Sequence, residues 1–469
     1  MIGQSRRSGV ALNGSLVRSA LIRGTAIVAA LSAATGFSQT VPQVPQVGQL
    51  GGSDIVNWTD GTLSGVADNL NPIAPSSTAT NLGLVVNQAA TVIDWTSFDI
   101  NGATVTFDAL PNFGNYSVLN RVAAGAALST INGTLTTETT TGNSGSIWLI
   151  NPNGIVFGSN AVVDIGNLGG FVAGTLEVNP SDFVAGVYSF NPSQSSNTSH
   201  IEVNNGANLS SQGPLILVSP QIISGDTSVL PAPVLRSNLG DVALVVARSV
   251  TVQLSGNSII NVSIAAGTEV TGSNGLDIVS GTIEGQRVFA ISAAALDPMA
   301  ALLNIGGSLT ANIAQQSQDG IILAAGASYA DTVSAPPATI VMPGSVSLSG
   351  GTVTVGAAAN LNAAGSGIAI GALEDANILA PNLSSGGDFR VQAGRDIVAT
   401  SQIIAGRDLT LLAGGNITST GPSASLTAGD DVAVVAGLGG AGNATVTFAE
   451  ATGLGPDSEV SGSPLVSDD

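Results

Sequence analysis

The chain contains no cysteine, which excludes disulfides, thiolate catalysis and cysteine-ligated metals. Lysine is also absent, so all 11 basic residues are arginine, and the sole histidine is His200. A single histidine removes most zinc and histidine-pair chemistry, and we expect no metal and no cofactor. Only 9% of the residues are charged and 4% are aromatic. This composition points away from an ordinary enzyme.

Charge is scarce and mostly of one sign. The 469 residues include 31 acidic side chains against 11 arginines, which gives a net charge of −20. Such an acidic surface argues against nucleic acid or anionic lipid as a partner. Beyond the N-terminal region no apolar run reaches the roughly 18 residues needed to cross a bilayer, so we expect a chain that does not span a membrane.

Residues 1–38 have the pattern of a secretory signal peptide. Scattered arginines precede a short apolar stretch, Ala26–Leu31, and small residues follow it. This order is typical of a signal peptide, with cleavage between about residues 34 and 40. A short core helix is the alternative, but it would bury a charged flank. We therefore expect an exported protein.

From about residue 52 onward, short apolar runs alternate with glycine, asparagine, aspartate and serine. The runs are too short for typical helices. Apolar residues make up 44% of the chain and are mostly small or β-branched, which favours strands. Two stretches, 293–303 and 368–379, could instead form a helical turn or a loop.

A repeat is explicit near the C-terminus. Asp388–Gly394 (DFRVQAG) returns as Asp408–Gly414 (DLTLLAG) and as Asp431–Gly437 (DVAVVAG), at spacings of 20 and 23 residues. Such periods are typical of a solenoid whose alternate apolar residues point inward. We predict an all-β fold, a parallel β-helix with coils stacked about 4.8 Å apart. If the whole mature chain were coiled, roughly 20 coils would result as an upper estimate.

The stretch 50–180 is less regular and contains all three tryptophans, Trp58, Trp95 and Trp148. A solenoid must cover its first open edge. An irregular, aromatic-rich start therefore predicts an N-terminal cap.

Residues 92–175 contain the most specific motifs of the chain. They include the segments VIDWTSFDINGATVTF, SVLNRVAAGAALSTINGTL and SIWLINPNGIVFGSNAVVDIGNLGGFVAGT. This stretch resembles the N-terminal two-partner secretion (haemagglutination activity) domain of the filamentous haemagglutinin family. The matching positions are Trp95, Phe98, Phe107, Asn120-Arg121-Val122, Ile131, Gly133, Asn151-Pro152-Asn153-Gly154-Ile155 and Phe157-Gly158. The family's other asparagine motif, NPNL, is absent.

The resemblance implies a right-handed parallel β-helix with an N-terminal cap and extra-helical strands. It implies a secretion domain at residues 39–300 that directs the chain to an outer-membrane transporter, whose periplasmic POTRA domains recognise it. We expect a β-helical repeat shaft at 301–455 and an acidic flexible tail at 456–469. The expected route leads through the periplasm to the cell surface or the extracellular medium. The resemblance further implies a haemagglutinin-like adhesin with an unknown host or bacterial surface ligand.

The motif Asn151-Pro152-Asn153-Gly154 also has local physics of its own. Pro152 presets φ, Asn151 can form an Asx-turn, and Gly154 can take a positive φ. The motif therefore predicts a tight corner before Ile155. Two functions stay open for it: the motif either shapes the corner alone or contacts the transporter directly.

Asn120 and Arg121 are the second group of candidate secretion-motif residues. Arg121 has no acidic residue nearby in the sequence. A structural hydrogen bond inside the cap is therefore the alternative to a role in recognition.

A β-helical polysaccharide-degrading enzyme is the alternative function, because this fold also hosts such enzymes. Hydrolysis of a glycosidic bond needs two facing carboxylates about 5–9.5 Å apart. Asp388, Asp408, Asp430 and Asp431 could approach this spacing, whereas as turn residues they would accept backbone N–H groups at corners. His200 has no obvious acid–nucleophile pair. We favour corner caps and predict no enzymatic activity.

Overall fold

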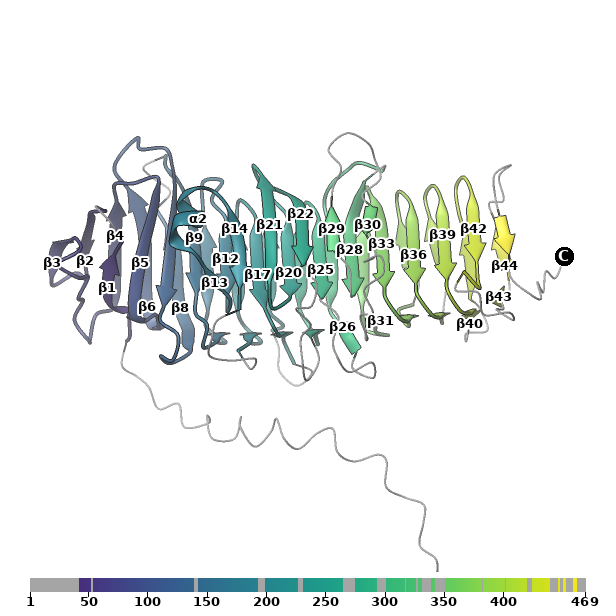
Figure 1. Ribbon diagram of the computed structural model, residues 1–469, viewed down its shortest axis with the longest axis horizontal. Coiled ribbons are helices and arrows are strands. Elements are labelled where there is room, and N and C mark those ends of the chain that lie inside the picture. The colour runs from purple at the N-terminus through teal and green to yellow at the C-terminus, as the bar shows by residue number, and fades with distance from the viewer. Residues whose placement is uncertain are drawn as a thin grey trace, which may run out of the picture. The chain divides into compact units, whose positions relative to one another are not determined.

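The described residues between 42 and 461 form stacked coils of short β-strands, shown as a computed structural model in Figure 1. The described residues are 42–51, 54–138, 142–192, 199–226, 231–264, 275–292, 301–316, 318–325, 328–330, 339–341, 351–381, 383–400, 402–419, 424–438, 446–447, 450–452 and 459–461. The expected signal peptide, 1–38, lies outside them. Within them, no helix is long and apolar enough to cross a membrane.

One face of the coils is a sheet of fourteen strands, which we name the front sheet. Its strands are, in spatial order, β1 (Gln46–Leu50), β5 (Ala90–Ser97), β7 (Asn115–Val122), β9 (Ser144–Ile150), β12 (Phe171–Gly174), β17 (Leu215–Ser219), β20 (Val242–Val246), β25 (Val288–Ser292), β28 (Asp319–Ala325), β33 (Gly367–Ala372), β36 (Phe389–Ala393), β39 (Leu409–Ala413), β42 (Val432–Val435) and β45 (Glu459–Ser461). All but β1 are parallel to their neighbours, and each parallel strand belongs to one coil. The described chain therefore contains thirteen coils.

The other side of the coils starts as one sheet and then divides. It begins with β4 (Asn81–Val86), β6 (Ile100–Ala109) and β8 (Ser129–Thr137). The first half of β8 pairs with β10 and the second half with β11, so the later coils have three sides, up to the coil that contains β42, β43 and β44. The second side contains β10 (Ile155–Phe157), β15 (Ile201–Val203), β18 (Ile222–Ser224), β23 (Leu276–Ile278), β26 (Ala301–Ile305), β31 (Thr352–Val355), β34 (Ala376–Ile378), β37 (Ile397–Ala399), β40 (Ile417–Ser419) and β43 (Val446–Thr447). The third side contains β11 (Val162–Ile165), β16 (Asn208–Ser211), β19 (Val234–Ser237), β24 (Thr282–Gly285), β27 (Ser308–Ala311), β32 (Asn360–Ala363), β35 (Leu383–Ser385), β38 (Ile403–Ala405), β41 (Ser425–Thr427) and β44 (Glu450–Thr452).

Gly133 lies at the point of division, inside β8. A Cβ at this position would lie 2.5 Å from the carbonyl oxygen of Ala103, so no side chain fits. The neighbouring Asn132 links three coils, because its amide donates to Asn101 Oδ1 at 3.2 Å and its Oδ1 accepts from the Asn160 N–H at 3.1 Å. The three-sided cross-section thus starts at Asn132-Gly133.

Alternation along the strands fills the coils. In β36, Phe389, Val391 and Ala393 are buried, whereas the residues between them are not. Phe389 stacks on Leu409 of β39, and Leu409 on Val432 of β42. The sequence repeats are therefore successive coils, and the predicted parallel β-helix is confirmed.

Antiparallel strands cover the open N-terminal edge. β1 pairs with β5, while β2 (Val56–Thr59) pairs with β4 and forms a hairpin with β3 (Ser64–Ala67). In this hairpin Asp60 accepts the backbone N–H groups of Leu63, Ser76 and Thr62, which lowers the pKa of its carboxyl group. The predicted cap is present.

A six-stranded antiparallel sheet, the outer sheet, forms outside the coils (Figure 1). It contains β13 (Glu177–Val178), β14 (Tyr188–Asn191), β21 (Val250–Ser255), β22 (Ser258–Ile264), β29 (Ser328–Ala330) and β30 (Thr339–Val341), and α2 (Pro180–Val184) lies between its first two strands. Trp148 of β9 packs against Phe183, Tyr188 and Phe190, with ring centroids 5.4, 4.7 and 6.0 Å apart. These are the extra-helical strands that the resemblance implies.

The outward-facing side chains of the front sheet change character along the coils. One column contains, coil by coil, Leu119, Trp148, Val172, Ile216, Ala243, Phe289, Ile322, Ala369, Arg390 and Thr410. Every member from Leu119 to Ala369 is buried, whereas Arg390 and Thr410 are partly exposed. The first part of the front sheet is therefore buried on both faces, and the last part on one face only.

The structure adds detail to several expectations. Of the two stretches considered for a helical turn or loop, residues 368–372 and 376–378 lie in β33 and β34, and 301–303 lie in β26, while 293–300 lie outside the described residues. The described residues contain thirteen coils, below the upper estimate of roughly 20, because the chain leaves the coils to build the outer sheet after β12, β20 and β28. Inside the expected tail at 456–469, Glu459–Ser461 pair with β42 and continue the front sheet. The sequence also did not indicate α2.

Candidate functional site

The NPNG motif forms the corner between β9 and β10. Asn151 is fully buried, and its side chain uses all of its hydrogen-bonding groups. Its Nδ2 donates to Ala127 O and Ser129 Oγ, both at 3.0 Å. Its Oδ1 accepts from Asn153 twice, from the backbone N–H at 2.9 Å and from Nδ2 at 2.7 Å. The backbone contact is the Asx-turn that the sequence predicts.

The rest of the motif closes the turn and starts the next strand. Pro152 is buried, and Gly154 has a φ of +124°, a conformation that favours glycine. The Gly154 N–H donates to Asn151 O at 3.1 Å. Ile155 is fully buried at the start of β10, and its N–H donates to the carbonyl oxygen of His200 in the next coil at 3.0 Å.

Asn153 ties the corner to the coil before it. Its Oδ1 accepts the Gly125 N–H at 2.7 Å, and its Nδ2 donates to Ala123 O at 2.9 Å. On the other side, the Asn151 N–H donates to Gly174 O of the following coil at 2.9 Å. The corner is therefore hydrogen-bonded to both neighbouring coils.

Asn120 and Arg121 are adjacent on β7 and face opposite sides of the front sheet. Asn120 is fully buried inside the coils, where its Oδ1 accepts from Trp95 Nε1 at 3.0 Å and its Nδ2 donates to Trp148 O at 3.2 Å. Arg121 points outward and binds Asp94 through Nη2 at 2.7 Å and Nε at 2.8 Å. The expected hydrogen bond of Arg121 therefore lies on the outer surface rather than inside the cap.

The structure brings Asn120-Arg121 and the NPNG motif close together, because β7 and β9 are adjacent strands of the front sheet. Asn120 and Arg121 stack directly on Leu149 and Ile150, which precede the NPNG corner. Sequence reasoning missed Asp94, which lies 27 residues before Arg121. The parallel register of β5 and β7 alone brings these two residues side by side.

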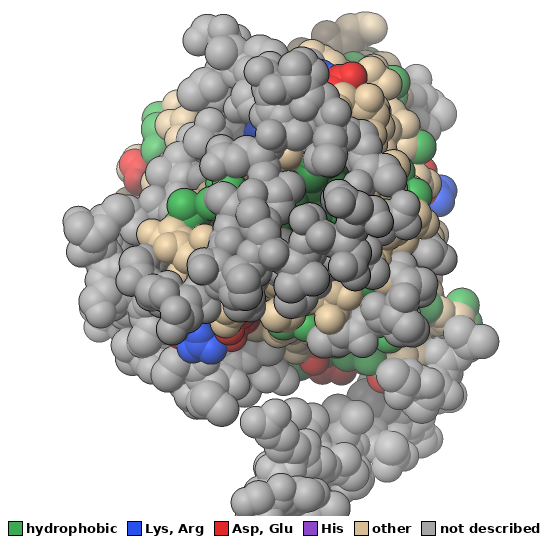
Figure 2. All heavy atoms as spheres, turned by 90° about the vertical axis from the view of Figure 1, so that its right-hand side faces the viewer, with side chains coloured by type: hydrophobic (Ala, Val, Ile, Leu, Met, Phe, Trp, Pro, Cys, Tyr) green, Lys and Arg blue, Asp and Glu red, His purple; other side chains and the backbone are tan. Residues whose placement is uncertain are grey.

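Other arginines also bind acids of different coils. Arg236 Nη2 lies 2.9 Å from Glu284 Oε2, Arg395 Nη2 lies 2.7 Å from Asp375 Oδ2, and Arg390 binds Asp319. Figure 2, a view onto the C-terminal end of the stack, shows arginine side chains beside acidic ones at the rim. These ion pairs connect different coils, and in them acidic side chains neutralise the positive charge of the arginines.

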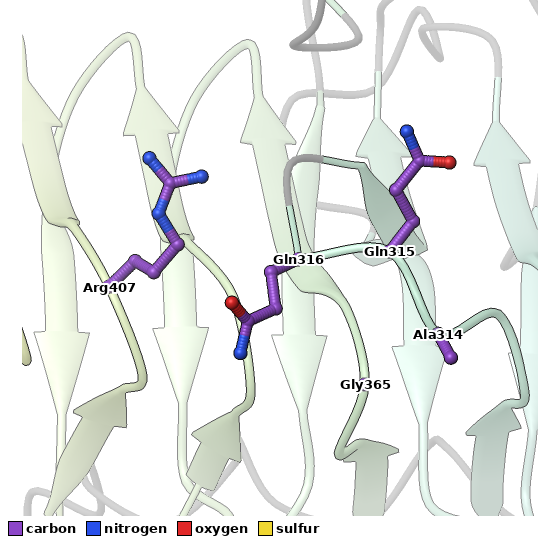
Figure 3. Close-up of a pocket in the computed structure, with 5 residues that line it drawn as sticks. All are labelled: Ala314, Gln315, Gln316, Gly365 and Arg407. Atoms are coloured by element: carbon purple, nitrogen blue, oxygen red, sulfur yellow. The ribbon is translucent and has the colours of Figure 1, made fainter.

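Three of the four aspartates considered for hydrolysis lie around one arginine. Arg407 Nε lies 3.8 Å from Asp388 Oδ1 and 3.8 Å from Asp430 Oδ2, and Arg407 Nη2 lies 4.0 Å from Asp408 Oδ2. Asp408 Oδ1 accepts the Asp431 N–H at 3.2 Å, as a corner cap does. Arg407 also lines an open groove of about 630 Å³ together with Ala314, Gln315, Gln316 and Gly365 (Figure 3). The contacts fit corner caps and ion pairs.

The coils, their cap and the outer sheet define a β-helical protein with a specialised N-terminal half. Residues 60–335, more than half of the chain, match the TPS secretion domain, and the chain belongs to this family. The match starts and ends later than the expected domain at 39–300. A TPS domain directs an exported chain to its transporter, so the protein is an exoprotein of a two-partner secretion system with an outer-membrane transporter as its partner.

Two solved structures are similar to the chain. The HMW1 secretion domain from Haemophilus influenzae is 14% identical, with a TM-score of 0.40, and the match covers 87% of this chain and 91% of that one. The filamentous hemagglutinin secretion domain is 12% identical, with a TM-score of 0.37 and coverage of 87% and 100%. No curated protein matches the chain.

Proposed function

We propose that residues 39–300 address the chain to an outer-membrane transporter through the transporter's periplasmic POTRA domains. The chain then passes from the periplasm to the cell surface or the medium, where the coils from residue 301 onward serve as the shaft of an adhesin. The observation that carries the export step is the TPS match over residues 60–335. The adhesin role rests on the resemblance to filamentous haemagglutinins, and its ligand is a separate question.

Within this function, we assign the NPNG motif to shaping the corner. Asn151 has no exposed surface, and each donor and acceptor of its side chain already has a partner inside the chain. A folded corner therefore offers no free polar group of Asn151 to a transporter. This saturation supports the structural reading over direct contact in the folded state.

The chemistry of the chain suits passage in an incompletely folded state. Without cysteine, no disulfide can trap the chain in the oxidising periplasm. The stacked parallel strands pair residues of adjacent coils that lie well apart in the sequence, for example 20 residues for Phe389 and Leu409 and 46 for Val242 and Val288. Such topology folds slowly because loops must close first. The lack of cysteine removes a covalent trap, and slow folding would delay compaction until the chain has crossed the outer membrane.

Secretion from a Gram-negative host, with and without the cognate transporter, tests the proposal. The wild type should appear outside only when the transporter is present. Asn151→Ala should reduce release, while the control Asn160→Ala should not, because Asn160 is exposed in the next corner of the same coil. Equal release with and without the transporter would rule out the address function.

A binding assay separates the two readings of the motif. Asn151→Ala protein, refolded and purified, should bind the isolated transporter as well as the wild type does. Loss of binding by a folded variant would instead show direct contact between the motif and the transporter.

A further inference from the structure

We infer that Asp241, Arg287 and the backbone of Ile259 form a buried clamp that holds the outer sheet on the coils. Asp241 precedes β20 and Arg287 precedes β25, at stacked corners of adjacent coils, while Ile259 belongs to β22 of the outer sheet. Asp241 Oδ2 accepts from Arg287 Nη2 at 2.8 Å and from the Ile259 N–H at 2.7 Å. Arg287 Nη2 also donates to Ile259 O at 2.7 Å. Both backbone groups of Ile259 are therefore bound by charged side chains.

The clamp differs from the other ion pairs in its burial. The side chains of Arg287 and Asp241 are 5% and 1% exposed, whereas those of Arg236 and Glu284 are 46% and 26% exposed. A buried ion pair adds little net stability, but removal of one partner leaves an uncompensated charge and is strongly destabilising. Asp241 and Arg287 belong to the coils, whereas Ile259 belongs to the outer sheet. Removal of one charge would therefore weaken the contact between the coils and the outer sheet.

The clamp also adjoins an apolar contact between the layers. The guanidinium carbon of Arg287 lies 5.0 Å from the ring centroid of Phe289. Phe289 and its column neighbour Ala243 point outward from the front sheet and are fully buried. On the other layer, Val252 and Val262 of β21 and β22 are buried too. Opening the clamp would let water reach these side chains.

The order of these residues in the sequence means that the clamp can form only after Arg287 has reached its place. Asp241 and the hairpin β21–β22 come first, and Arg287 follows 46 residues after Asp241, just before β25. Until Arg287 is in place, a docked hairpin buries the Asp241 carboxylate without its cation. The hairpin therefore docks after the coil containing β23, β24 and β25 has formed. By the same logic, β21 and β22 can open while the coils stay intact.

Hydrogen exchange on the full-length protein, followed by mass spectrometry, tests the clamp. Arg287→Met should raise the exchange rates of Ile259 and the paired amides of β21 and β22 on the order of 100-fold or more. The amides of β20 should keep their protection. The matched control, Arg236→Met, removes an exposed arginine of the neighbouring third side and should leave β21 and β22 unchanged. Unchanged exchange in Arg287→Met, or equal acceleration of β20, would overturn the inference.

Two further measurements test the inference even if Arg287→Met does not fold. In Asp241→Asn/Arg287→Met the buried charges are gone together, and an amide oxygen at position 241 can still accept the Ile259 N–H, so the hairpin should be better protected than in Arg287→Met. In the unaltered chain at rising denaturant, β21 and β22 should exchange before β20 and β25 do. Exchange of the hairpin only together with these coils would refute a separate opening step.

Discussion

Replacing Asn151 by alanine gives the sharpest test of the corner. The substitution removes two donated hydrogen bonds, to Ala127 O and Ser129 Oγ, and two accepted ones, both from Asn153. A typical hydrogen bond contributes about 0.5–1.5 kcal/mol net, and a buried group left without a partner costs more. Because Ala127 lies at the surface and water can replace one partner, we expect a loss of about 2–4 kcal/mol in the free energy of unfolding.

Equilibrium denaturation of the purified chain, followed by circular dichroism, measures this loss. Asn160→Ala is the control and should change the free energy of unfolding by less than about 0.5 kcal/mol, since exposed positions away from such networks tolerate substitution. An Asn151→Ala variant as stable as the control would refute the reasoning, because the four hydrogen bonds would then contribute nothing measurable.

Three further outcomes follow from the same structure. Gly133→Ala places a methyl group against the carbonyl oxygen of Ala103 and should cost about 1–3 kcal/mol, whereas Gly83→Ala meets only ordinary contacts and should cost less; thermal unfolding compares them. Arg121→Met breaks a half-exposed ion pair and should cost no more than about 1 kcal/mol, an effect that 1 M salt should abolish if the pair acts through its charge. Burial raises the pKa of the Asp277 carboxyl group, so folding favours its protonated form. Asp277→Asn should therefore stabilise the chain at pH 7, and this gain should vanish near pH 3, where the carboxyl group is protonated in both states; an unchanged gain at both pH values would contradict the assignment.

The repeat and the corner could be predicted from the sequence because both depend on local chemistry. The spacings of 20 and 23 residues correspond to single coils, since one repeat separates each strand of the front sheet from the strand stacked on it. The turn at Asn151 also follows from neighbouring residues, because an asparagine side chain can bond the backbone two positions on. The resemblance placed the chain in the right family before any contact was known.

The outer sheet has a signal in the sequence of the strands that it covers. β20 contains the continuous apolar run Val242–Val246 and β25 the run Val288–Ile291, whereas β36 alternates. Continuous runs are typical of strands buried on both faces, so they predict a covering layer. They do not identify the segment that provides the cover, because any apolar hairpin could do so.

Charge pairing was decided by tertiary structure alone. Arg121 lies 27 residues from Asp94, and Arg287 lies 46 residues from Asp241. These sequence separations do not match a fixed repeat length, because the coils differ in length and strands of the outer sheet are inserted between some of them. The sequence by itself determined the stacked coils and the shape of the NPNG corner, which depend on residues close together in the chain. The partners of buried and surface charges depended on the register of distant strands, and only the folded coils set that register.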